Sequence, residues 1–174
     1  MPLRLIWSHG KDAVPWGAKS QALAQRARTF GLELEAPDYT STQDPDRRVE
    51  MLLDLLAGAT GPVLLAGSSM GGYVSAATAL RRPVAGLFLL APALYLEGYA
   101  VQDFSALSCP VAAIHGWRDD VVPVEHSIRF ARRLGARLLL LEAGHRMTEQ
   151  AETVADAYAR FLAERLDEQQ DNKG

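Results

Sequence analysis

Short apolar runs recur along the chain, separated by longer stretches in which apolar residues return every three or four positions. The runs are typical of β-strands, and the longer spacing is typical of helices with one buried face. Residues 63–66 and 87–90 are apolar without interruption, which indicates strands buried on both faces. Residues 32–36 alternate between apolar and polar, which predicts an edge strand with one solvent-exposed face. The predicted strands are 3–7, 32–36, 63–66, 87–90, 111–114 and 137–141, and the predicted helices are 18–30, 49–57, 73–80, 124–134 and 148–166.

The regular alternation of strands and helices predicts an α/β protein. We expect a mostly parallel six-stranded sheet between two layers of helices, a three-layer α/β/α arrangement. Active sites in such folds lie beyond the carboxyl ends of the strands, so we expect the functional residues among those that follow each strand. We expect one domain over residues 1–166 and a polar C-terminal tail over residues 167–174.

Composition and charge narrow the functional classes. The 174 residues carry 18 Lys and Arg against 21 Asp and Glu, so charge gives no reason to expect nucleic acid or an anionic membrane as partner. Cys109 is the only cysteine, which excludes an internal disulfide. The histidines lack metal-ligand spacing, and we expect neither a metal nor another cofactor. Arg4 interrupts the apolar start of the chain and no stretch reaches membrane-spanning length, so we expect a cytoplasmic protein without a membrane span.

A Gly-x-Ser-x-Gly pentad lies between a predicted strand and a predicted alanine-rich helix. Its serine is Ser69, and Gly67 and Gly71 flank it two positions away on either side. A serine at a sharp strand-to-helix turn takes a strained backbone conformation, and the glycines leave room for the tight approach of the chain. The pentad in this context predicts a nucleophile elbow, whereas the bland alternative is a small residue at a tight junction.

An acid and a histidine follow the serine, and Ser, Asp, His is the chain order used by folds with a nucleophile elbow. Asp119 comes after the predicted strand 111–114, and His145 comes after the predicted strand 137–141. A serine hydroxyl needs a base to take its proton, and the imidazole needs a carboxylate to fix its tautomer. Asp120 is a competing choice for the acid, and Glu142 is a more remote one.

The other histidines have simpler interpretations. His9 and His115 precede glycines at strand ends, where hydrogen bonds that orient loops are the expected role. His126 falls in a predicted helix and is expected at the surface. The oxyanion of an acyl-transfer site needs two backbone N–H donors, of which Met70, the residue after the serine, is one and the loop after the first strand supplies the other.

Four segments together resemble the α/β-hydrolase superfamily, and most closely its small, cap-poor serine esterases. They are residues 8–11, 67–72, 115–123 and 144–147. The segments 119–123 and 145–147 are similar to the depalmitoylating thioesterase branch. The resemblance implies Ser69 as nucleophile, Asp119 as acid, His145 as base, and the N–H groups of Lys11 and Met70 as the oxyanion hole.

Compared with that family, the chain departs in two places. It begins at what would be the family's third strand, and residues 92–108 are too short for a full cap domain. The expectation is a minimal α/β-hydrolase fold lacking the first strands and a cap, with an open groove. Candidates to line that groove are Trp16, Trp117 and the segment with Tyr95, Tyr99 and Phe104, although aromatic residues in short loops more often cover the core.

The sequence therefore favours a serine hydrolase that cleaves carboxylic esters or thioesters through an acyl-enzyme. Its substrate would be a small molecule or an acylated protein. Two alternatives stay open at this point. One is a non-catalytic binding or scaffold protein on a hydrolase fold, and the other is an acyltransferase or amidase that uses the same serine.

Overall fold

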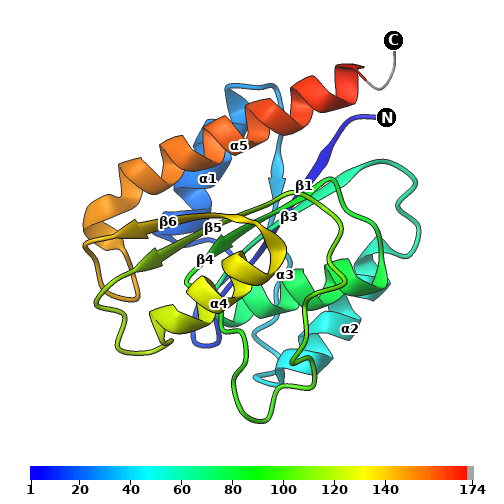
Figure 1. Cartoon of the computed structure of the whole chain (residues 1–174). Coiled ribbons are helices and arrows are strands. Elements are labelled where there is room, and N and C mark those ends of the chain that lie inside the picture. The colour runs from blue at the N-terminus through cyan, green and yellow to red at the C-terminus, as the bar shows by residue number, and fades with distance from the viewer. Residues whose placement is uncertain (172–174) are drawn as a thin grey trace.

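The computed structural model describes residues 1–171 (Figure 1). The strands are β1 (Arg4–Ser8), β2 (Leu34–Glu35), β3 (Val63–Ser68), β4 (Gly86–Leu90), β5 (Val111–Gly116) and β6 (Arg137–Leu141). The helices are α1 (Ala18–Arg28), α2 (Pro45–Leu56), α3 (Met70–Arg81), α4 (Val124–Leu134), the 3₁₀ turn η1 (Thr148–Gln150) and α5 (Ala151–Asp171).

All six strands form one parallel sheet in the order β2-β1-β3-β4-β5-β6. The predictions of a central β3 and β4 and of an edge strand near residue 34 are confirmed. The edge strand is shorter than the alternating pattern indicated, because only Leu34 and Glu35 pair with β1. The prediction of a six-stranded α/β fold is also confirmed.

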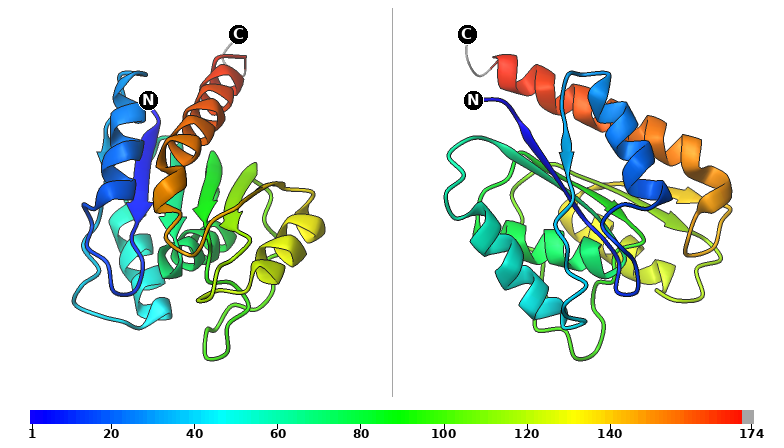
Figure 2. Two further views of the ribbon diagram at one scale, coloured as in Figure 1. Left: turned by 90° about the vertical axis from the view of Figure 1, so that its left-hand side faces the viewer. Right: turned by 180° about the vertical axis from the view of Figure 1, so that it is seen from behind.

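Helices cover both faces of the sheet. In Figures 1 and 2, α1 and α5 lie on one face, and α2, α3 and α4 lie on the other. Neighbouring residues of β3 pack on opposite faces of the sheet. Leu64 lies in the core beneath α1 and α5, Leu65 lies in the core on the other face, and neither is exposed to solvent. This double burial explains why the central strands are apolar at every position.

Local sequence signals set where two helices begin. Helix α2 starts at Pro45, earlier than the predicted residue 49, because the Asp44 carboxylate accepts hydrogen bonds from the N–H groups of Asp46 and Arg47. That Asp-Pro pair is a typical N-cap and first-turn combination. Helix α3 starts at Met70, three residues before the predicted start, directly after the turn that carries Ser69.

The last helix is longer than predicted. It follows η1 and continues to Asp171, five residues beyond the predicted end at residue 166, and an ion pair between Arg165 and Glu168 spans one of its turns at 2.6 Å. Residues 172–174 of the predicted polar tail lie outside the described residues. Within residues 1–171, no helix combines the length and the apolar character that crossing a membrane would require.

Candidate active site

Ser69 occupies a strained turn between β3 and α3. Its backbone angles are φ 54° and ψ −119°, a conformation that residues other than glycine rarely adopt. Two hydrogen bonds hold the turn: Ser69 N–H donates to the Leu90 carbonyl at 2.9 Å, and Ala93 N–H donates to the Ser69 carbonyl at 2.9 Å. Strain of this kind persists only where the surrounding structure enforces it, as it does at many functional sites.

The two glycines of the pentad allow close approach of the backbone. A Cβ atom at Gly67 would overlap the backbone of Gly71, and a Cβ atom at Gly71 would overlap the carbonyl of Ser8 at the end of β1. Both positions therefore require glycine for a steric reason. The pentad sequence follows from the contact between the turn and β1.

Asp119 and His145 form a hydrogen-bonded pair at the carboxyl ends of β5 and β6. Asp119 Oδ2 lies 2.7 Å from His145 Nδ1, and the carboxylate is fully buried whereas the imidazole is partly exposed. Asp120 is exposed, and Glu142 forms an exposed ion pair with Arg118 at 2.6 Å. Of the three acids considered from the sequence, Asp119 is the one in contact with the imidazole.

The surroundings of Asp119 favour its ionised form. Burial works to raise the pKa of this carboxyl, but hydrogen bonds from Val122 N–H, His145 and Val121 N–H outweigh burial and lower its pKa. The two backbone donors reach Asp119 Oδ1 at 2.8 and 2.9 Å, which leaves Oδ2 for the imidazole. A fixed anion at this place holds His145 with its proton on Nδ1 and its Nε2 free to accept another.

A second imidazole, that of His115, contacts the same Asp119 carboxylate. His115 is fully buried, and its Nε2 lies 3.0 Å from the Val122 carbonyl and 2.9 Å from Asp119 Oδ2. Its Nδ1 lies 2.7 Å from Ser127 Oγ. Burial lowers the pKa of His115, with the Val122 carbonyl and Asp119 acting in the opposite sense, so the ring is neutral with its proton on Nε2. The ring therefore orients the 117–123 loop.

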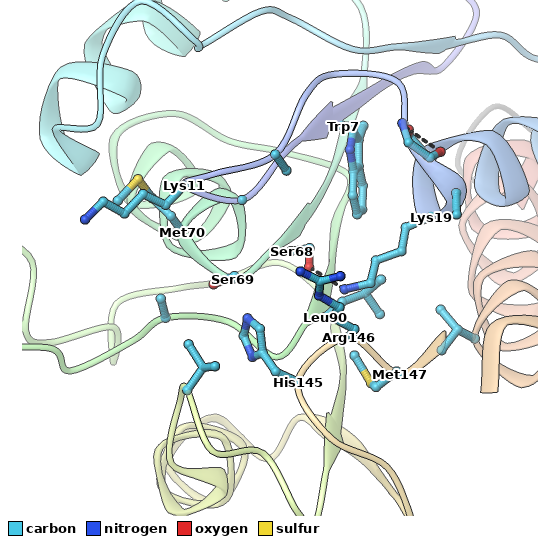
Figure 3. A pocket seen from close by; sticks show the side chains of 18 of the residues that line it. Trp7, Lys11, Lys19, Ser68, Ser69, Met70, Leu90, His145, Arg146 and Met147 are labelled. Atoms are coloured by element: carbon cyan, nitrogen blue, oxygen red, sulfur yellow. Dashed lines mark hydrogen bonds between the residues drawn. The ribbon is translucent and has the colours of Figure 1, made fainter. Parts of the chain in front are cut away.

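Ser69 and His145 line the same cavity, and Figure 3 shows the imidazole extending from its loop toward the serine. Among residues 1–171 no hydrogen bond joins Ser69 Oγ to the imidazole. Catalytic hydrogen bonds are often long before substrate binds and tighten in the complex. Ser69 and His145 therefore face the same cavity, and the contact between the Asp119 carboxylate and the His145 imidazole is already formed.

The two residues expected to supply backbone donors for an oxyanion both line the cavity that holds Ser69. Met70 is the first residue of α3, where N–H groups have no acceptor within the helix. Lys11 lies in the loop after β1.

A buried arginine fixes that β1 loop. The Arg48 guanidinium, which has no solvent exposure, donates to the carbonyls of Gly10 and Lys11 at 3.1 Å each and to the Thr42 carbonyl at 2.9 Å. His9 adds to this, because its Nδ1 lies 2.9 Å from the Gly10 carbonyl and its Nε2 accepts from Tyr39 N–H at 3.1 Å. The position of the Lys11 N–H thus depends on contacts from α2 and from the segment after β2.

The cavity over Ser69 has a volume of about 890 Å³ and lies between the strand ends, α1 and the start of α5. Its aromatic lining residues are Trp7 and Tyr99. Of the aromatic candidates from the sequence, Tyr99 lines the cavity, whereas Trp16, Tyr95, Phe104 and Trp117 do not. Trp16 and Trp117 are 45% and 52% exposed, and Tyr95 packs against Phe104.

Residues 92–108 form one wall of the cavity and are tied to the body of the molecule. Tyr73 on α3 donates its hydroxyl proton to Asp46 and accepts from Val101 N–H at 3.0 Å. Asp46 Oδ2 accepts from Ala100 N–H at 3.1 Å. Leu94 and Phe104 anchor the segment in the core.

Sequence reasoning missed three polar residues of the site. Lys19 and Arg146 line the cavity together with Ser68, and Arg48 fixes the β1 loop. Helical periodicity places Lys19 among solvated positions, and no motif marks Arg48. Arg146 is adjacent to His145, which was the one usable signal.

Comparisons with known proteins agree with this architecture. Residues 4–103 match the uncharacterised protein family UPF0227. A crystal structure from Xanthomonas campestris pv. campestris, assigned to the alpha/beta hydrolase superfamily, is 32% identical with a TM-score of 0.85, and the match covers 92% of this chain and 98% of that one. Est1E from Butyrivibrio proteoclasticus shares the fold at 19% identity and a TM-score of 0.86, over 95% of this chain and 88% of that one.

A curated relative is also similar in sequence. It is the mitochondrial palmitoyl-protein thioesterase ABHD10 of Bos taurus, 23% identical over 78% of this chain. The matched region spans 64% of the length of that relative.

Proposed function

The chain belongs to the uncharacterised protein family UPF0227 and to the α/β-hydrolase superfamily, and from this membership and its site geometry we propose that it is a serine hydrolase of carboxylic esters or thioesters. The observation that carries the proposal is the convergence of Ser69, on its strained turn, with the hydrogen-bonded pair of Asp119 and His145. The curated relative is named as a thioesterase, which supports the same class of reaction.

In the proposed mechanism, Ser69 Oγ attacks the carbonyl carbon of the substrate. His145 Nε2 takes the hydroxyl proton, and Asp119 stabilises the imidazolium that results. The oxyanion accepts hydrogen bonds from the N–H groups of Met70 and Lys11. When the intermediate collapses, the bond to the leaving alcohol or thiol breaks, the imidazolium returns its proton to that group, and the acyl group stays on Ser69.

Water completes the proposed cycle. It attacks the acyl-enzyme, gives one proton to His145 Nε2 and forms a second tetrahedral intermediate on the same oxyanion donors. Collapse of that intermediate releases the carboxylic acid and returns the proton to Ser69 Oγ. The open cavity could admit an ester of a small molecule or of an acylated protein. The cytoplasmic location predicted from the sequence stays a prediction, and the thioesterase relative is named as mitochondrial.

Labelling with a fluorophosphonate tests the proposal without knowledge of the natural substrate. We expect the wild-type protein to be labelled on Ser69, with the adduct located by peptide mass spectrometry, and Ser69→Ala to be unlabelled. Ser41→Ala removes an exposed serine from another loop and serves as the matched control. A folded wild-type protein that takes up no label, or an adduct on Ser68 instead, would contradict the proposed nucleophile and favour a binding protein on a hydrolase fold.

A further inference from the structure

Two cationic side chains converge beside the proposed nucleophile. Lys19 extends from the first turn of α1, and its Nζ lies 3.1 Å from Ser68 Oγ. Arg146 follows His145 and reaches the same part of the cavity, where Figure 3 shows its guanidinium next to the Lys19 ammonium. The positive charge of Arg146 also acts on the pKa of Lys19, which places the two groups within electrostatic range.

No carboxylate of the described chain contacts either of these two cations as an ion-pair partner. Across residues 1–171, neither Lys19 nor Arg146 forms an ion pair, whereas Arg26 and Arg118 do. Asp12 is the one acid among the described residues that line the cavity, and its Oδ1 accepts from the Gln43 amide at 3.1 Å. The Asp119 carboxylate acts on the Lys19 ammonium without forming an ion pair with it, and Arg146 is exposed, so a bound anion would be the first direct ionic partner of either cation.

The burial of Lys19 also favours a bound anion. Burial is the main cause that lowers the pKa of its ammonium; Asp119 opposes it, and Arg146 reinforces it. The nearby Asp119 carboxylate is already occupied by His145 and by two backbone N–H groups. The cavity therefore holds positive charge for which the chain itself supplies no direct partner.

We propose that Lys19, Arg146 and Ser68 bind a carboxylate on the substrate, so that the preferred ester carries a free acid group. This proposal rests on the proposed hydrolase function, because the anion site and the nucleophile share one cavity. A guanidinium offers parallel donors to both carboxylate oxygens, the ammonium adds a point charge, and the Ser68 hydroxyl can donate a hydrogen bond.

The positions of the residues limit the length of the substrate. Ser68 directly precedes Ser69, and consecutive Cα atoms are about 3.8 Å apart, so we expect a short linker between the scissile carbonyl and the bound acid group. Leu23 of α1 and Val154 of α5 supply apolar contacts for such a linker in the same cavity. The substrate class is thus a short monoester or monothioester of a dicarboxylic acid, or a short ester whose alcohol bears the acid.

Matched esters distinguish these two sources of the carboxylate. Monomethyl glutarate and methyl pentanoate differ by an acid group at the end of the acyl chain. The acetate ester of 3-hydroxypropanoate and propyl acetate differ by an acid group on the alcohol. Proton release gives kcat/KM for all four. We expect the acidic member of one pair to be preferred by about 10- to 100-fold, as for hydrogen bonds between charged groups.

Removal of either cation should abolish that preference selectively. Lys19→Met keeps an unbranched side chain without charge, and Arg146→Gln keeps hydrogen-bonding capacity without charge. Each should lower kcat/KM for the acidic ester at least about tenfold more than it lowers kcat/KM for the neutral ester. Arg133→Gln removes an exposed charge from α4 outside the cavity and is the control. Equal preference in the wild type and both variants would overturn the anion site while the hydrolase function stands.

A binding measurement tests the anion site apart from turnover. Monomethyl glutarate is titrated into Ser69→Ala by calorimetry, with dimethyl glutarate as the neutral comparison. We expect the monoester to bind at least tenfold more tightly than the diester, and Lys19→Met in the same background to remove the difference. Equal binding of the two esters would overturn the anion site, whereas a wild type that fails to react with any fluorophosphonate would count against the hydrolase function alone.

Discussion

Asp119 Oδ2 and His145 Nδ1 lie 2.7 Å apart although 26 positions separate the two residues in the chain. The contact exists because β5 and β6 are neighbouring parallel strands that end at the same edge of the sheet. The residues that follow the two strands are therefore brought together by the topology. This pairing is the basis of the first prediction.

Asp119→Asn should lower kcat by about 10³- to 10⁴-fold. The amide can still accept the two backbone hydrogen bonds through its oxygen, but its NH₂ group then faces His145 Nδ1 and favours the tautomer with the proton on Nε2. An imidazole in that form cannot accept the serine proton. Steady-state kinetics with a hydrolysed ester gives the measurement. Asp120→Asn, which changes an exposed neighbour, should retain activity within a few-fold, and equal losses in the two variants would contradict the assignment.

Gly71→Ala should destabilise the fold by several kcal/mol or prevent folding, because the added Cβ would overlap the Ser8 carbonyl. Gly58→Ala adds the same methyl group at an exposed position that has no atom within contact distance, so its effect on the free energy of unfolding should stay within about 1 kcal/mol. Urea denaturation followed by circular dichroism compares the two. Similar stabilities would show that the turn can move away from β1.

The pattern of apolar residues was sufficient to predict the layers and, to within about two residues, most element bounds. Helix α4 and strand β6 have the predicted bounds, because each is a continuous periodic segment limited by clear turn residues. The helix α3 start was misjudged because Met70, Gly71 and Gly72 have little helical signal of their own, and the turn at Ser69 is what sets them in a helix. Contacts along one segment are visible in the sequence, whereas contacts set by tertiary packing are not.

The same distinction explains which site residues could be found. Ser69, Asp119 and His145 each follow a strand, so the fold alone groups them at one edge. Lys19 lies in a helix whose orientation about its axis decides between solvent and cavity, and Arg48 reaches the β1 loop only through the packing of α2. Neither relation leaves a periodic or motif signal in the chain.

Arg48→Met should lower kcat more than it raises KM. The guanidinium holds the carbonyls of Gly10 and Lys11, and its loss would leave buried carbonyls unpaired and displace the expected oxyanion donor. We expect about a 10²-fold loss in kcat and a stability loss of about 2–4 kcal/mol. Arg47→Met changes the exposed residue next to Arg48, and it should lower neither kcat nor stability.

Arg48→Lys separates position from charge. A single ammonium cannot donate to both carbonyls and to Thr42 in the fork geometry of a guanidinium, so we expect only partial recovery of kcat. Full recovery by lysine would show that the charge alone matters. A fall in stability with unchanged kcat would reduce Arg48 to a purely structural residue.

Stability should fall as the pH drops below about 6.5, and His115 should contribute to that fall. Burial lowers the pKa of His115 in the folded protein, whereas the unfolded chain has the ordinary value near 6.5. Between these values the unfolded chain binds the proton and the folded protein does not. The contribution of His115 is therefore complete above about pH 6.5 and is lost as the pH falls toward the folded pKa, at up to about 1.4 kcal/mol per pH unit.

Urea unfolding at pH 7.5 and pH 5.5 measures this contribution. His115→Gln retains an amide that can donate to the Val122 carbonyl but does not titrate, so its loss of stability between the two pH values should be smaller than that of the wild type, by at most about 1.4 kcal/mol. His126→Gln on α4 is the comparison variant. If His115→Gln and the wild type lost equal stability, folding would not lower the pKa of His115.

The wall formed by residues 92–108 bears on the fate of an acyl group. Tyr73 and Asp46 tie this segment down, so admission of substrate does not depend on its displacement. Under the proposed mechanism, an acyl group on the partly exposed Ser69 would stay in contact with bulk water throughout the life of the intermediate. An acceptor other than water would then have to compete with the solvent itself, and this partition favours release of a free acid over transfer of the acyl group to a second molecule.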